Sequence, residues 1–167
     1  MIESALFKTG MRRLASGVSV ITTALHSEWY GLVATSVCSV SVEPPSLLVC
    51  VNRTSSSHDA IRAAGVFCVN LLRQSDDAIA TRFGDPQHRH ARFANRGDWA
   101  TLATGAPALI GALASFDCEI ADTVASGSHT IFIGNVRAAE LWQNEIVPLI
   151  YLDGRFGGCV AAGSAGE

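Results

Sequence analysis

Seven runs of β-branched and other apolar residues, separated by short polar connections, constrain the fold of this chain most strongly. Runs of this length, bounded by Gly, Pro, Asn, Asp or Ser, are typical of β-strands. Pro44 and Pro45 end the second run, because neither proline can donate a hydrogen bond to a neighbouring strand. The seven predicted strands are residues 18–23, 32–42, 46–52, 66–72, 112–124, 130–141 and 147–152.

Helical patterns precede and interrupt these strands. Phe7, Met11 and Leu14 recur at the spacing of one helix face, which predicts an N-terminal amphipathic helix. Two shorter helices are expected at residues 57–64 and 76–83. The short connections and the lack of a regular β–α alternation favour a mainly β fold, an antiparallel barrel with peripheral helices. No G-x-G-x-x-G sequence follows a strand, which argues against a Rossmann dinucleotide site.

Length and composition limit the possible classes of protein. The 167 residues predict one domain, residues 1–160, followed by a flexible tail at residues 161–167. A formal net charge of −3 argues against nucleic-acid binding, and the longest apolar run is too short to cross a bilayer. Only 16% of the residues are charged, against about 25% in an average soluble domain, which favours a homo-oligomer. The lack of a signal peptide and of any C-x-x-C pair predicts a cytoplasmic protein.

The segment from Cys50 to Ser57 carries the strongest chemical signal. A strand ends there, Arg53 and four consecutive hydroxyl residues follow, and a helix begins. Exposed backbone amides at a helix start, hydroxyl donors and a fixed cation are the groups that bind phosphate. A hydroxyl-rich helix N-cap without a ligand explains the same residues, and both interpretations stay open at this point.

Other candidate sites give weaker signals. The small donors of residues 35–41 suit either a planar heteroaromatic ligand or one solvated strand face. His129 lies at a predicted hairpin turn, where a histidine is usually only solvated. Residues 84–98 form a long polar loop, and loops of this length are more often functional than idle. His88 and His90 in that loop have the spacing of a metal pair, but arginines surround them and no metal site is expected.

Several sequence stretches, in this order and spacing, resemble the short-chain flavin reductase family. The likeness is strongest to the reductase components of two-component flavin-dependent monooxygenases of the 4-hydroxyphenylacetate 3-monooxygenase type. It covers residues 6–157 and implies an FMN-binding split β-barrel, a Greek-key antiparallel fold with short helices. The matching stretches include SGVSVITT, GLVATSVCSVSVEPPSLLVCVNRTSSS, FCVNLL, ATRFGD, RFA, GSHTIFIGNV and PLIYLDGRFG.

The resemblance implies an NAD(P)H:flavin oxidoreductase. Such an enzyme transfers a hydride from NADH or NADPH to FMN or FAD, and it supplies the reduced flavin to a partner monooxygenase. A homodimer is expected. Hydride transfer to a flavin needs no protein nucleophile, which agrees with the lack of a G-x-S-x-G turn. Two alternatives remain, a non-catalytic FMN-binding or electron-relay module and a split-barrel oxidase acting on a pyridoxal-type phosphate.

The resemblance also implies roles for individual residues. His129, the candidate catalytic residue, belongs to a Gly-Ser-His turn where many family members have Gly-Asp-His. On the nicotinamide side it is joined by Tyr151, Gly154 and Arg155. The residues implied for the flavin are Gly31, Leu32, Val33, Thr35, Ser36, Cys50, Val51, Asn52, Ser56, Ser57, Arg82 and Phe83.

Overall fold

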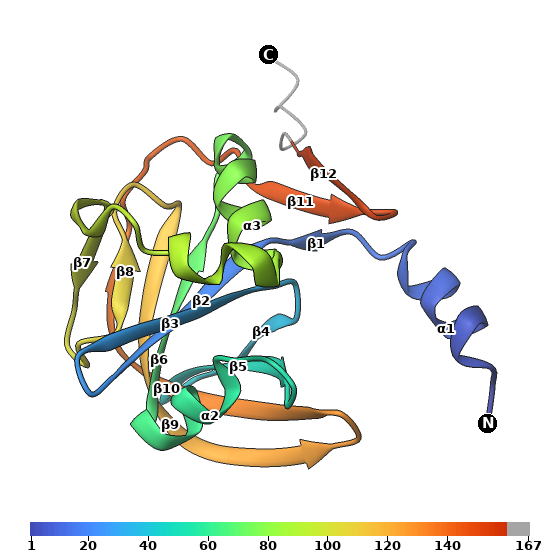
Figure 1. The fold of residues 1–167 in the computed structure, drawn as a ribbon, viewed down its shortest axis with the longest axis horizontal. Coiled ribbons are helices and arrows are strands. Elements are labelled where there is room, and N and C mark those ends of the chain that lie inside the picture. The colour runs from blue at the N-terminus through green and yellow to red at the C-terminus, as the bar shows by residue number, and fades with distance from the viewer. Residues whose placement is uncertain (160–167) are drawn as a thin grey trace.

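The computed structural model describes residues 1–159, and the predicted flexible tail at residues 161–167 lies outside them. Its main sheet has seven antiparallel strands and confirms the predicted mainly β fold (Figure 1). The strands are β2 (Ser19–Leu25), β3 (Glu28–Ala34), β4 (Val37–Val42), β5 (Pro45–Asn52), β6 (Val66–Leu71), β9 (Ala114–Ser126) and β10 (His129–Glu140). Their order across the sheet is β3-β2-β6-β9-β10-β5-β4, so neighbours in the sheet are often distant in the sequence.

The short turn between the two edge strands, β3 and β4, is hydrogen-bonded to β5. The backbone N–H of Cys50 donates to the carbonyl oxygen of Ser36 at 3.2 Å, and the Ser36 hydroxyl donates to the carbonyl oxygen of Cys50 at 3.1 Å. The interior of the curved sheet is filled by fully buried apolar side chains, among them Ile21, Phe67 and Phe132. This core fixes the positions of the strand ends that carry the candidate residues.

Within residues 1–159, three α-helices lie outside the main sheet: α1 (Ser4–Met11), α2 (His58–Ala64) and α3 (Asp77–Gly84). None of the residues of α1 is buried, and Figure 1 shows this helix projecting from the body of the protein. No helix within residues 1–159 is long and apolar enough to span a membrane. Two small sheets complete the fold, one of β1 (Ser16–Gly17), β11 (Leu149–Leu152) and β12 (Arg155–Gly158), the other of β7 (Trp99–Thr101) and β8 (Pro107–Leu109).

Some predicted boundaries were wrong. The run 32–42, predicted as one strand, is divided at Thr35 and Ser36 between β3 and β4. The division arises because Ser36 forms its hydrogen bonds with Cys50 in the turn between these strands. Residues 84–98 contain two short 3₁₀ helices, Pro86–Ala91 and Arg96–Asp98, rather than only irregular loop.

The first five residues of β9, Ala114–Cys118, are buried or half-buried on both faces, although polar and apolar residues alternate along residues 112–124 and predict a half-buried strand. Asp117 is fully buried, and its carboxylate accepts hydrogen bonds from the backbone N–H of Thr104 at 2.6 Å and the Thr104 hydroxyl at 2.5 Å. Burial raises the pKa of the Cys118 thiol to about 12 and that of Cys68 well above its usual value, and the Asp117 charge adds to both shifts. Both thiols therefore stay protonated and unreactive at neutral pH.

Candidate functional site

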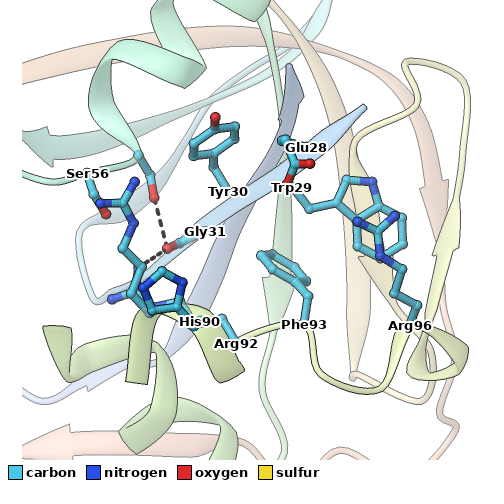
Figure 2. A pocket seen from close by; sticks show the side chains of 11 residues that line it. Glu28, Trp29, Tyr30, Gly31, Ser56, His90, Arg92, Phe93 and Arg96 are labelled. Atoms are coloured by element: carbon cyan, nitrogen blue, oxygen red, sulfur yellow. Dashed lines mark hydrogen bonds between the residues drawn. The ribbon is translucent and has the colours of Figure 1, made fainter. Parts of the chain in front are cut away.

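A cavity of about 460 Å³ lies between β3, the start of α2 and the loop that follows α3 (Figure 2). Ser56 and Ser57 enter it from the start of α2, so the hydroxyl-rich segment does reach a cavity. Gly31 of β3 forms its floor. The remaining lining residues are Glu28, Trp29, Tyr30, Arg89, His90, Arg92, Phe93 and Arg96.

Two side chains converge on the carbonyl oxygen of Gly31. The Ser57 hydroxyl donates to it at 2.9 Å, and Nη1 of Arg92 donates to it at 2.7 Å. Both side chains are buried, with Ser57 at 1% and Arg92 at 8% exposure. A glycine is required at position 31, because a Cβ there would lie 2.6 Å from Cε1 of Phe83. The contact of β3 with Phe83 therefore leaves no room for a side chain at the residue whose carbonyl oxygen joins the serine and the arginine.

Arg92 has a hydrogen-bond donor to spare. Its Nε is buried and has no partner among the residues that the structure describes. Burial lowers the pKa of the Arg92 guanidinium, and the neighbouring positive charge of Arg89 lowers it further. An arginine remains protonated at neutral pH despite such a shift. A buried cation with an unused donor, beside a second cation and the hydroxyl of Ser56, is a site for an anionic oxygen ligand.

Aromatic side chains form the wall of the cavity next to these cations. The ring of Phe93 lies edge-on to Trp29, with ring centroids 5.6 Å apart, and edge-on to Phe83 at 5.2 Å. The Arg96 guanidinium carbon lies 4.3 Å from the centroid of the Trp29 ring, in a cation–π arrangement. The cavity thus joins a cationic region to an aromatic one.

Thr35 lies in the turn between β3 and β4 and does not line this cavity. It lines a second cavity, of about 640 Å³, together with Tyr151 and Gly154 of the β11–β12 hairpin and with residues of α1. The structure therefore brings one residue predicted to bind the flavin together with two predicted to bind the nicotinamide. Arg155 is exposed and does not line either cavity.

His129 lies beside the end of β5 and outside both cavities. It is the first residue of β10, faces Asn52 across the strand pair, and is exposed. One ring nitrogen, Nδ1, lies 2.9 Å from the Ser128 hydroxyl. The backbone N–H of Arg53 donates to the carbonyl oxygen of Ser128 at 2.9 Å, which ties this hairpin to the segment before α2.

Several other candidate residues have structural contacts. Val51 and Phe83 are buried in the core, and Leu32 and Val33 pack against the same core clusters. Asn52 accepts hydrogen bonds through Oδ1 from the backbone and hydroxyl of Thr54, which shapes the turn before α2. For these residues the side chain supports the site.

The sequence did not single out the residues that give the cavity its charge and its aromatic wall. Arg92 is the main omission, together with Trp29, Phe93 and Arg96. The available signals were the long polar loop at residues 84–98 and the Arg-Phe-Ala stretch that begins at Arg92. Neither signal says that one arginine of that loop turns inward to reach β3.

The seven-stranded antiparallel sheet, with a cationic, hydroxyl-lined cavity beside β3, defines a protein of the split β-barrel class. Within this class the chain belongs to the flavin reductase like domain family, whose model matches residues 11–159.

Similar proteins agree with this assignment. The FMN reductase (NADH) RutF 2 of Methylorubrum extorquens is 44% identical over 137 residues, which cover 82% of this chain and 79% of that protein. BorF, the flavin reductase component of a bacterial two-component tryptophan halogenase, has a TM-score of 0.87 at 31% identity, covering 96% of this chain and all of that chain. The Streptomyces globisporus NADH:FAD oxidoreductase SgcE6, solved with NAD and FAD fragments, has a TM-score of 0.85 at 30% identity, covering 98% and 96%.

Proposed function

We propose that this protein is an NADH-dependent flavin reductase that transfers a hydride from the nicotinamide to FMN or FAD. The observation that carries the proposal is the buried Arg92, whose Nε has no partner within residues 1–159, at a cavity that Ser56 and Ser57 also line. This donor set fits the phosphate of a flavin nucleotide. The names of the relatives, FMN reductase (NADH), support the choice of donor and acceptor.

The proposed roles follow from the positions of the residues. Ser56, Arg89 and Arg92 hold the phosphate, and Ser57, whose hydroxyl donates to the carbonyl oxygen of Gly31, lies beside it. The backbone at Thr35–Ser36 and Cys50–Asn52 lies along the edge of the ring system, with Gly31–Val33 and Arg82–Phe83 supporting it. On the nicotinamide side the proposed residues are His129, Tyr151, Gly154 and Arg155.

When bound, the flavin supplies the hydride acceptor, so the protein needs no nucleophile of its own. The contribution of the chain is to hold the two nucleotides in contact and to exclude water between them, which is catalysis by proximity and orientation. We assign His129 to hydrogen bonding with the nicotinamide of the electron donor or with the flavin ring.

We further propose that residues 1–160 act as one domain in the cytoplasm, and that the reduced flavin passes to a partner monooxygenase or a related oxygenase. BorF and its halogenase are a precedent for such a pair.

The test is flavin-dependent oxidation of NADH by the purified protein, followed by the loss of NADH absorbance. We expect turnover with FMN or FAD and none without added or bound flavin. NADPH in place of NADH measures the donor preference in the same assay. Tight flavin binding without NADH oxidation would contradict the proposal and identify a non-catalytic flavin-binding module. Reduction of a bound flavin by an amine substrate instead of NADH would identify an oxidase.

We also propose that the protein is a homodimer and that α1 contacts the second copy. Phe7 is 56% exposed and Met11 47% exposed on a helix that buries none of its residues in its own subunit. Phe7→Glu is expected to shift the protein from dimer to monomer in sedimentation velocity, because it places a charge in an apolar interface. Thr9→Glu is the matched control, since Thr9 lies on the opposite side of the helix. A monomeric wild-type protein would rule out this interface.

A further inference from the structure

The cavity at Gly31 has two chemically different ends. Figure 2 places Ser56, Arg92 and His90 on one side of Gly31, and Trp29 and Arg96 at the opposite side. The first end has the hydroxyls and the buried cation that suit a phosphate. The second end is built from an indole ring and a guanidinium group stacked on it. One phosphate does not account for the second end.

The stacked pair of Trp29 and Arg96 is suited to a purine base. Arg96 is exposed, and the structure gives its guanidinium no salt bridge within residues 1–159, only the contact with Trp29 at 4.3 Å. Both groups are flat, and bases stack on aromatic rings and on arginine planes in the same way. Glu28, at the same end of the cavity, offers carboxylate oxygens that accept hydrogen bonds from an exocyclic amine or from ribose hydroxyls.

The aromatic end and the phosphate end belong to one cavity, whose lining carries an excess of positive charge. The cavity lining carries three arginines, Arg89, Arg92 and Arg96, against the single carboxylate of Glu28. This excess of positive charge suits a pyrophosphate, which carries a second negatively charged group beyond the first phosphate. FMN ends at its phosphate, whereas FAD continues through a second phosphate to an adenosine.

We propose that Trp29, Arg96 and Glu28 form an adenosine subsite, through which the enzyme distinguishes FAD from FMN. The proposal rests on the flavin reductase function argued above and assigns its flavin specificity. The first phosphate of FAD lies at Ser57 and Arg92, the second lies within reach of the cavity arginines, and the adenine stacks on the Arg96–Trp29 pair. FMN fills only the cationic end and gains nothing from these three residues.

The test is the affinity of the oxidised flavins, measured by quenching of flavin fluorescence in the absence of NADH. Arg96→Ala is expected to weaken FAD binding about tenfold, the effect of losing one stacked base, and to leave FMN binding unchanged. Trp29→Leu, which keeps apolar bulk against Phe93, is expected to shift the FAD-to-FMN ratio in the same direction. Arg137→Ala is the matched control, because Arg137 is an exposed arginine on β10 that pairs with Glu119 and lies away from the cavity.

The outcomes separate this inference from the proposed function. Equal losses of FAD and FMN affinity in Arg96→Ala, or no loss of either, would overturn the adenosine subsite and leave the reductase function standing. A raised KM for NADH with unchanged flavin affinities would also overturn it, because the aromatic end would then bind the adenosine of the electron donor. Failure of the wild-type protein to bind either flavin would overturn the proposed function, and the subsite with it.

Discussion

Arg92→Ala is expected to weaken FMN binding about hundredfold while changing riboflavin binding little. The substitution removes a buried cation and its unpartnered Nε from the phosphate end of the cavity. A hydrogen bond to a charged group contributes about 1.5–3 kcal/mol, and the upper value corresponds to about a hundredfold in affinity. Riboflavin has no phosphate, so it loses nothing directly. The measurement is a fluorescence titration of both ligands with each variant.

Two controls separate the loss of charge from a loss of structure. Arg92 also holds the carbonyl oxygen of Gly31, so the variant could act by loosening β3. Arg92→Lys keeps the charge and is expected to recover part of the FMN affinity. Arg62→Ala removes an exposed arginine of α2 outside the cavity and is expected to leave both affinities unchanged. Equal losses of FMN and riboflavin affinity would show that Arg92 supports the fold and does not contact a phosphate.

Gly134→Ala is expected to lower the free energy of unfolding more than any other single substitution proposed here. Gly134 lies in β10 against the core, and a Cβ there would lie 2.6 Å from Cζ of Phe67 and 2.8 Å from Cβ of Cys118. Both neighbours are fully buried and cannot move aside without disturbing the sheet. Overpacking of this kind costs about 3 kcal/mol, which lowers the Tm of a domain of this size by roughly 8 °C. Thermal unfolding monitored by circular dichroism measures the change.

A second substitution tests the assigned cause. Phe67→Leu shortens the side chain that a Cβ at position 134 would meet, so the double variant should lose less stability than the two single losses together. Gly10→Ala is the control, because a Cβ at that exposed helical position meets nothing within 4 Å. Additive losses in the double variant would mean that the contact with Phe67 is not the reason glycine is needed.

Patterns with a local physical cause could be predicted from the sequence. The strand around residues 66–72 is a short apolar run, and its position was confirmed as β6 (Val66–Leu71). The end of the helix predicted at residues 57–64 was also confirmed, because Gly65 follows it with a φ of 70°, which residues with a side chain rarely adopt. In both cases neighbouring residues alone determine the conformation.

Features that depend on distant parts of the chain could not be predicted in this way. The break at Thr35 and Ser36 forms because Ser36 bonds to Cys50, and the local sequence reads as one continuous strand. The inward position of Arg92 depends on Gly31, which lies 61 residues earlier. The burial of Asp117 depends on Thr104 in a separate loop. The hydroxyl side of the site could therefore be anticipated, and its arginine and aromatic sides could not.

The carbonyl oxygen of Gly31 has a consequence for the energetics of ligand capture. Ser57 and Arg92 already donate hydrogen bonds to this oxygen, so their rotamers are selected when the protein folds rather than when a nucleotide binds. Ordering a long, flexible side chain at the moment of association costs about 0.5–1.5 kcal/mol of conformational entropy. Here that cost belongs to folding, so an arriving anion meets an arginine side chain that is already held in place.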